Sequence, residues 1–185
     1  MGTIRVHEFT TLDGSIGAPM WTIEYPFTDR MASSIGALTD ASGAILLGRT
    51  TWEQMGPAWS SRTADDDPGT PFFNETPKHV VSGTLRSAEG WNNSTVLGAY
   101  DPAALRAFKD GVDGGIYVSG SGTLVRAMLA DGLVDELHLY VYPVAVGEGP
   151  KLFPEGAPKH ALTLTACEAF DNGVVHLAYA PGAAV

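Results

Sequence analysis

The sequence of 185 residues contains a single cysteine, Cys167. One thiol excludes an intramolecular disulfide and a cysteine-rich zinc site. No apolar run approaches the roughly 18 residues that a membrane-spanning helix requires. The first residues, MGTIRVHEFTTLDG, also lack the apolar core of a signal peptide. We therefore expect a cytoplasmic protein with no membrane partner.

Basic residues are scarce: 11 Lys and Arg stand against 21 Asp and Glu, which gives a formal net charge of −10. Because nucleic-acid phosphates require a basic face, we expect no nucleic-acid partner. A small phosphorylated ligand is not excluded, since salt screens distant charges beyond ~8–10 Å and local donors decide its binding. The densest acidic run, 65–67, adjoins Pro68 and Gly69 and indicates a solvated loop rather than a metal site.

The pattern of apolar residues predicts one α/β domain covering residues 1–185. At this length a domain buries roughly 70% of the surface that its unfolded chain exposes. Stretches rich in β-branched and aromatic residues alternate with stretches of helical periodicity, which is typical of a mostly parallel sheet. The expected strands are 3–10, 44–47, 78–82, 94–97, 116–118 and 135–144.

Capping residues and prolines predict where the helices begin and end. Thr28 is a suitable N-cap for a helix that Gly43 would stop, and Asp101 precedes a proline at the first helical position. A helix after Gly48 is expected to break before Pro57, and 60–76 to be loop. The chain then closes with an antiparallel hairpin, of strands 162–170 and 174–179 around an Asn-Gly turn.

The segment 115–131, GIYVSGSGTLVRAMLAD, is the clearest candidate for a ligand site. The turn of Ser119, Gly120, Ser121, Gly122 and Thr123 joins a short strand to a helix that begins near its end. Glycines allow a ligand to approach the backbone closely, and the free N–H groups of the first helical turn favour an anion such as phosphate. The same glycines would also suit a simple tight turn. Because no third glycine follows, the dinucleotide fingerprint is absent.

Two further strand ends have the same character. Gly48, Arg49 and Thr50 follow one apolar strand, and Ser82-Gly83-Thr84 follows the next. The carboxyl ends of parallel strands lie on one edge of a sheet, where ligands bind. Arg49 offers a planar fork to a phosphate, and the hydroxyl groups can donate hydrogen bonds. Together the three turns predict a site for a molecule with several phosphates.

Several segments resemble the dihydrofolate reductase superfamily. ILLGRTTWEQM is similar to its strand-turn-helix unit. TTLDGSIG, TPKHVVSGTL, IYVSGSGTLVRAML and DELHLYVYPVAVGEGPKLF resemble more specifically the branch that contains the reductase domain of bifunctional riboflavin-biosynthesis enzymes. These segments occur in the expected order over nearly the whole chain. The resemblance implies a three-layer fold, with a mainly parallel sheet of about eight strands, helices on both faces and NADPH across the strand ends.

The resemblance also implies roles for particular residues. Gly48, Arg49 and Thr50 would meet the cofactor phosphates, Ser82 and Thr84 would lie near the adenosine 2′-phosphate, and the backbone of 119–123 would hold the pyrophosphate. The loop from Asp13 to Trp21 would cover the nicotinamide, with Trp21 placed to stack on a planar substrate. Glu148 would lie near a sugar-phosphate substrate.

Two carboxylates are candidate catalytic groups. Dihydrofolate reductases carry one early in the helix before the Gly-Arg turn, and Asp29 and Glu24 lie in that region, although their spacing to Gly48 differs from the family's. Asp29 is equally an ordinary first-turn acid that stabilises the helix dipole. Asp13 either belongs to the site or makes a simple Asp-Gly turn. Four of the five histidines lie in expected strands, and none of the five is expected to have a catalytic role.

The expected activity is NADPH-dependent reduction of a small heterocyclic or ribityl-type substrate. The bifunctional riboflavin enzymes add a zinc deaminase, whose cysteine ligands cannot be assembled from Cys167 alone, so a free-standing reductase-like domain is expected. Alternatives are dihydrofolate reduction and a non-catalytic nucleotide-binding module with the same fold. A homodimer is expected, formed through the strand 137–144 and the closing hairpin.

Overall fold

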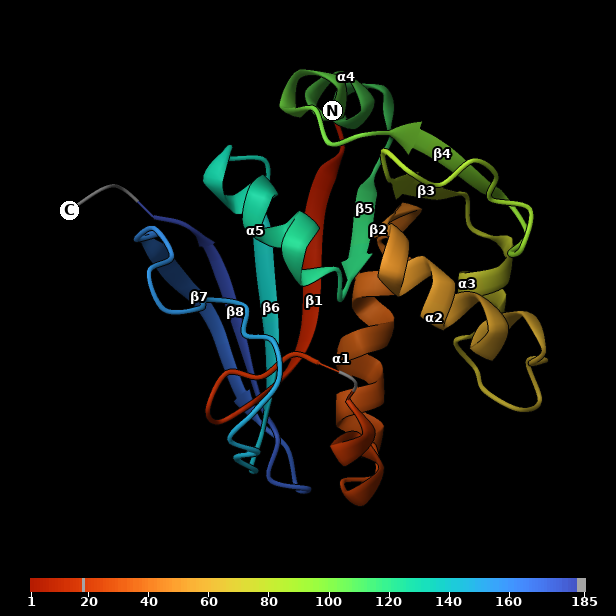
Figure 1. The fold of residues 1–185 in the computed structure, drawn as a ribbon. Helices are drawn as coiled ribbons and strands as arrows, with labels where there is room; N and C mark the ends of the chain where they lie inside the picture. The colour runs from red at the N-terminus through yellow and green to blue at the C-terminus, as the bar shows by residue number, and fades with distance from the viewer. Residues whose placement is uncertain (18, 183–185) are drawn as a thin grey trace.

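The computed structural model describes residues 1–17 and 19–182, which form an eight-stranded sheet covered by helices (Figure 1). The strand order is β4-β3-β2-β5-β1-β6-β8-β7. The strands are β1 (Thr3–Thr11), β2 (Ser42–Gly48), β3 (Lys78–Val81), β4 (Ser94–Gly98), β5 (Gly115–Ser119), β6 (Glu136–Tyr142), β7 (Leu162–Ala169) and β8 (Val175–Pro181). The first six pair in parallel and the last two are antiparallel, which confirms the predicted fold class.

The helices cover both faces of the sheet because strand side chains alternate between the two. The helices are α1 (Asp29–Asp40), α2 (Arg49–Ser60), α3 (Thr70–Glu75), α4 (Pro102–Gly111) and α5 (Gly122–Ala130), with a 3₁₀ turn, η1 (Met20–Glu24), after β1. On one face Ile4 and Val6 of β1 pack with Met128 of α5 in one buried cluster. On the other face Tyr140 belongs to a second cluster that includes Met31 of α1.

The predicted helix starts are confirmed where a side chain caps them. The hydroxyl of Thr28 accepts a hydrogen bond from the Met31 N–H, at 3.2 Å. The carboxylate of Asp101 accepts hydrogen bonds from Ala103 and Ala104, at 2.8 and 3.3 Å. These bonds satisfy N–H groups that the helix itself leaves free. Each cap depends only on residues within one turn, which is why the sequence alone could locate it.

Three predicted boundaries were wrong. Helix α1 ends at Asp40 and β2 begins before Gly43. Helix α2 continues through Pro57 to Ser60, because Trp59 in its last turn stacks on Phe73 with ring centroids 4.2 Å apart. That tertiary contact outweighs the local tendency of proline to end a helix.

The third error concerns residues 60–76, which were predicted to be loop but contain the short helix α3. Its Phe73 is buried, and Lys78 of β3 stabilises its carboxyl end. The Lys78 ammonium is buried and donates hydrogen bonds to the carbonyl oxygens of Phe73 and Thr76, at 2.7 and 2.9 Å. Because this cap comes from the following strand, the local sequence gave no sign of it.

None of the helices formed by residues 1–17 and 19–182 combines the length and apolar character needed to cross a membrane.

Candidate functional site

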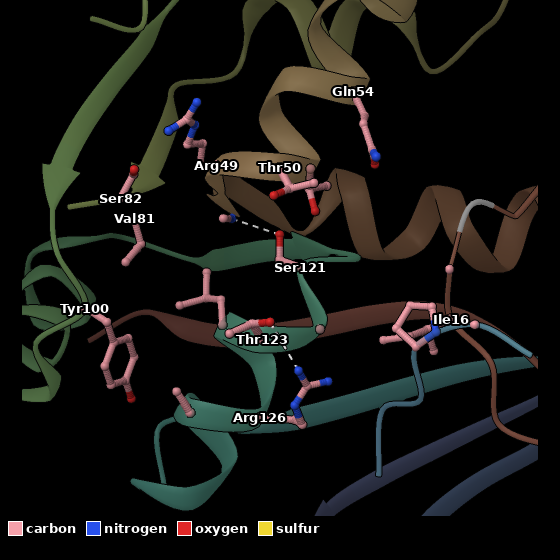
Figure 2. A pocket seen from close by; sticks show the side chains of 18 of the residues that line it. Ile16, Arg49, Thr50, Gln54, Val81, Ser82, Tyr100, Ser121, Thr123 and Arg126 are labelled. Carbon is pink, nitrogen blue, oxygen red and sulfur yellow. Dashed lines mark hydrogen bonds between the residues drawn. The ribbon is translucent and has the colours of Figure 1, made fainter. Parts of the chain in front are cut away.

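The carboxyl ends of β2, β3 and β5 open into one cleft of about 960 Å³ (Figure 2). This volume is in the range of sites for cofactors and drug-sized ligands. Each of the three predicted strand-end turns contributes to the wall of the cleft. The contributing residues are Gly48, Arg49, Thr50, Ser82, Gly83, Ser121, Gly122 and Thr123.

The turn between β5 and α5 presents a free helix N-terminus to the cleft. Gly120 and Ser121 have left-handed backbone angles, with φ of 57° and 66°. The Ser121 hydroxyl accepts a hydrogen bond from the Gly48 N–H at 2.8 Å, which joins this turn to the end of β2. No side chain caps α5, so the N–H groups of its first turn are available to an anion. The Gly120 N–H donates instead to the His7 carbonyl at 3.2 Å, so the predicted pyrophosphate contact stays a prediction for the N–H groups of Ser121, Gly122 and Thr123.

Arg49 links the ends of β2 and β3. Its Nε donates to the Glu53 carboxylate at 2.7 Å, and its Nη1 donates to the Thr84 hydroxyl at 2.9 Å. Ser82 in turn accepts hydrogen bonds from the N–H groups of Thr84 and Leu85. Thr84 therefore forms hydrogen bonds with both Arg49 and Ser82 and holds them in place. Arg49 and Ser82 line the cleft, whereas Thr84 is not among the lining residues.

Two loops close the opposite end of the cleft. Ile16 donates its N–H to the Pro150 carbonyl at 2.8 Å, which joins the loop after β1 to the loop after β6. The Asp13 carboxylate accepts hydrogen bonds from the Thr11 hydroxyl at 2.6 Å and from the Gly147 N–H at 2.8 Å. These bonds, the Thr11 hydroxyl first, lower the pKa of Asp13 to about 2. Asp13 thus holds the two loops together and is not itself among the residues that line the cleft.

The other candidates from the sequence divide between the cleft and the surface. Trp21 and Glu148 line the cleft, as the prediction of substrate contacts requires. The Trp21 ring packs edge-on against Tyr142, with centroids 4.8 Å apart. Asp29 is exposed in the first turn of α1 and does not line the cleft. The structure therefore brings neither Asp13 nor Asp29 to the cleft wall.

Four polar residues of the cleft were missed by sequence reasoning: Thr51, Gln54, Tyr100 and Arg126. Arg126 donates hydrogen bonds to the Thr123 hydroxyl at 3.1 Å and to the Lys151 carbonyl at 3.0 Å. Arg126 lies one helical turn after Gly122 and therefore on the same face of α5, so the sequence could have indicated that it reaches the cleft. Tyr100 follows the end of β4, so the strand-end argument applied to it as well.

The residues that line the cleft include more basic than acidic side chains, although the protein as a whole is acidic. Arg49 and Arg126 line the cleft, and Glu148 is the only acidic residue among the lining residues in the described part of the chain. The net charge of −10 therefore does not describe the field that a ligand meets here. Within residues 1–17 and 19–182, no cluster of three His, Cys, Asp or Glu side chains is arranged to hold a metal.

The sheet order, the antiparallel terminal hairpin and the cleft across the strand ends define an α/β protein of the dihydrofolate reductase-like superfamily. More specifically, the chain belongs to the RibD C-terminal domain family, whose model matches residues 2–176.

Similar proteins agree with this assignment. YyaP of Bacillus subtilis (strain 168), an uncharacterized protein, is 27% identical over 184 residues, which is 91% of this chain and 89% of YyaP. A protein of Shewanella sp. PV-4 that has been assigned to riboflavin biosynthesis has a similar structure, with a TM-score of 0.73 and 21% identity over 98% of this chain and 99% of its own.

A second solved structure is the diaminohydroxyphosphoribosylaminopyrimidine deaminase/5-amino-6-(5-phosphoribosylamino)uracil reductase of Thermotoga maritima. It matches with a TM-score of 0.67 and 15% identity, over 98% of this chain and 57% of its own. At such identities the two structures establish the shared fold.

Proposed function

We propose that this protein is an NADPH-dependent reductase of a small heterocyclic substrate. The observation that carries the proposal is the convergence of two helix N-termini without side-chain caps, those of α2 and α5, on a cleft that also holds Arg49. N–H groups, hydroxyl groups and a guanidinium on one rim suit a ligand with several phosphates. Membership of the RibD C-terminal domain family supports a reductase.

The distribution of donors along the cleft suggests how NADPH would lie. Arg49 and Ser82, at the β3 end, would hold the 2′-phosphate of the adenosine. The first turn of α5, from Gly122, would hold the pyrophosphate. The nicotinamide would then reach the end closed by Ile16 and Trp21, where apolar side chains and the two joined loops exclude water.

When bound, NADPH supplies the hydride, and the chain's own residues bind, orient and shield it. The substrate class proposed is an aminouracil carrying a ribosyl or ribityl chain, in keeping with the named activity of the Thermotoga maritima protein. Dihydrofolate is the less suitable substrate, because neither Asp13 nor Asp29 reaches the cleft. A cytoplasmic location, where NADPH is abundant, is part of the same proposal.

Isothermal titration tests the cofactor. We expect NADPH to bind at least tenfold more tightly than NADH, and Arg49→Ala to reduce that preference by about tenfold, because a charge-assisted hydrogen bond contributes about 1.5–3 kcal/mol. Arg62→Ala, which changes an exposed arginine outside the cleft, is the matched control and should retain the preference. Absence of NADPH binding at protein concentrations in the tens of micromolar range would rule out the proposal.

Turnover tests the chemistry separately. With an aminouracil substrate, the near-ultraviolet absorbance of the reduced nicotinamide should decline. If NADPH binds but no pteridine, aminouracil or quinone consumes it, the chain is a nucleotide-binding module rather than a reductase.

A further inference from the structure

Both arginines of the cleft lie where the proposed dinucleotide has its phosphates. Arg49 lies near Ser82 at the β3 end, the proposed site of the 2′-phosphate (Figure 2). Arg126 lies at the first turn of α5, the proposed site of the pyrophosphate, because its Nη1 is 3.3 Å from the position of a Cβ added to Gly122. Within residues 1–17 and 19–182, no other Lys, Arg or His lines the cleft. The lining residues therefore offer no further cation to a phosphate on the substrate.

The opposite end of the cleft, which Ile16 and Trp21 close, carries negative charge. Glu148, in the loop after β6, lines the cleft there. The residue before it, Gly147, donates its N–H to the Asp13 carboxylate at 2.8 Å. Asp13 is ionised at neutral pH, since its hydrogen bonds lower its pKa to about 2. Two carboxylates thus belong to this end, one that lines the cleft and one that is bonded to the same loop.

The backbone on both sides of Glu148 is held in place. Before it, Gly147 is bonded to Asp13. After it, Gly149 packs so closely on Ser15 that an added Cβ would lie 2.6 Å from the Ser15 hydroxyl oxygen. The exposed side chain of Glu148 therefore extends from a fixed point on the rim of the cleft.

Gln54 adds an uncharged polar group to the same end. Figure 2 shows Gln54 on the side of the cleft where Ile16 lies, away from Arg49 and Ser82. A side-chain amide both donates and accepts hydrogen bonds, and a carboxylate accepts them from hydroxyl and N–H groups. Gln54 and Glu148 together suit the hydroxyl groups of a sugar chain and the N–H groups of a heterocycle. A phosphate at this end would meet like charge.

We infer that the substrate is an aminouracil whose ribosyl chain carries no phosphate, and that Glu148 disfavours the phosphorylated form. This inference rests on the proposed function and narrows its substrate class. The Thermotoga maritima protein is named for a phosphorylated compound, 5-amino-6-(5-phosphoribosylamino)uracil. The two proteins would thus share a fold and differ in the charge of the substrate that they take.

Lys151 is a further cation on the same loop. It is exposed and is not among the residues that line the cleft. Its backbone forms an isolated bridge with Ser15, and its carbonyl accepts a hydrogen bond from Arg126 at 3.0 Å. An exposed ammonium is strongly hydrated and screened by salt, so we expect Lys151 to offset the charge of Glu148 only in part.

The test measures kcat/KM at saturating NADPH for two substrates that differ only in the phosphate. They are 5-amino-6-(5-phosphoribosylamino)uracil and the compound that alkaline phosphatase makes from it. We expect the wild type to prefer the dephosphorylated substrate by at least about tenfold, mainly through KM, which corresponds to ~1.4 kcal/mol. Glu148→Gln removes the charge and keeps the size, so it should reduce the preference to about threefold or less. Glu155→Gln, at an exposed site outside the cleft, is the matched control and should retain the preference.

Ionic strength provides a second readout. Salt screens exposed charges, so the preference of the wild type should decline as KCl is raised from about 0.05 M to about 0.5 M. In Glu148→Gln the preference should depend much less on salt. A purely steric rejection of the phosphate would not depend on salt in either protein and would contradict the inference.

The remaining outcomes separate the inference from the proposed function. A wild-type preference for the phosphorylated substrate, whether or not Lys151→Ala removes it, would overturn the inference and leave the reductase proposal standing. A preference that Glu148→Gln leaves unchanged would assign the selectivity to another group and overturn it as well. If neither substrate consumed NADPH, the proposed function itself would fail and the inference with it.

Discussion

Glu8, a residue of β1 with 2% of its surface exposed, affects the stability of the protein in a direction that its buried environment sets. Its pKa in the folded state is about 8, above the ordinary value of 4.5, so the folded protein holds a proton that the unfolded chain has released. The contribution of Glu8 to the free energy of unfolding is therefore complete below pH 4.5 and is lost as pH rises through about 8. Glu8→Gln should remove this decline.

Urea unfolding at several pH values measures that effect. Buried His7 and His176 act in the opposite direction, because burial lowers their pKa to about 3 and about 4 and their contribution is lost in acid. The quantity to compare is therefore the change in the free energy of unfolding between about pH 6.5 and about pH 8.5, in the wild type and in Glu8→Gln. The lower pH is the ordinary pKa of histidine, 6.5, and the upper pH lies above the Glu8 pKa of about 8. Identical slopes in the two proteins would show that Glu8 is already ionised at neutral pH.

At the scale of an element, the first turn of α5 is the part of the proposed site where an added side chain would have the least room. Gly122 begins that helix, and a methyl group there would collide with Ile16. We expect Gly122→Ala to displace Ile16 and to weaken NADPH binding by about tenfold, which corresponds to ~1.4 kcal/mol. The helix itself should tolerate the change, because alanine favours a helix over glycine by about 1 kcal/mol.

Gly36→Ala is the control for this prediction. Gly36 lies within α1, and nothing is within 4 Å of an added Cβ. Thermal unfolding of both variants, with titration of NADPH, distinguishes an effect on the helix from an effect on the cleft. Wild-type affinity in Gly122→Ala would show that the nucleotide does not pass over this turn.

For the whole molecule, the feature of the fold that bears on assembly is the exposed edge of the sheet at β7. Strand β6 pairs with β1 on one side and β8 on the other, so the predicted contact through the strand 137–144 cannot be an edge pairing. Within residues 1–17 and 19–182, no strand pairs with the outer edge of β7, and Leu164 on β7 is 52% exposed. Long exposed edge strands favour pairing with another chain. We propose that the closing hairpin forms the contact of a homodimer.

Sedimentation measurements check this arrangement. Leu164→Lys should convert the dimer to a monomer, because it places a charge at the centre of the contact, and should leave NADPH affinity unchanged within about twofold. Leu97→Lys, on β4 at the opposite edge of the sheet, is the control and should remain a dimer. A wild-type protein that is monomeric at micromolar concentration would contradict the proposal.

Features with a local cause could be predicted from the sequence, and features with a distant cause could not. The strands of the parallel sheet, the caps at Thr28 and Asp101 and the three turns at strand ends depend on neighbouring residues, so their patterns located them. The continuation of α2 past Pro57 depends on Phe73, which the local pattern does not include.

The same division holds for the cleft. Its rim of N–H groups and hydroxyls was determined by the sequence, because parallel strands with such ends must present them on one edge. The tertiary structure decided the rest. The Asp13 carboxylate accepts a hydrogen bond from the Gly147 N–H, 134 residues away. Glu8 is buried next to a turn that follows it by more than a hundred residues. Burial and long-range hydrogen bonds determine the charge of a carboxyl group, and neither is present in the chain until it folds.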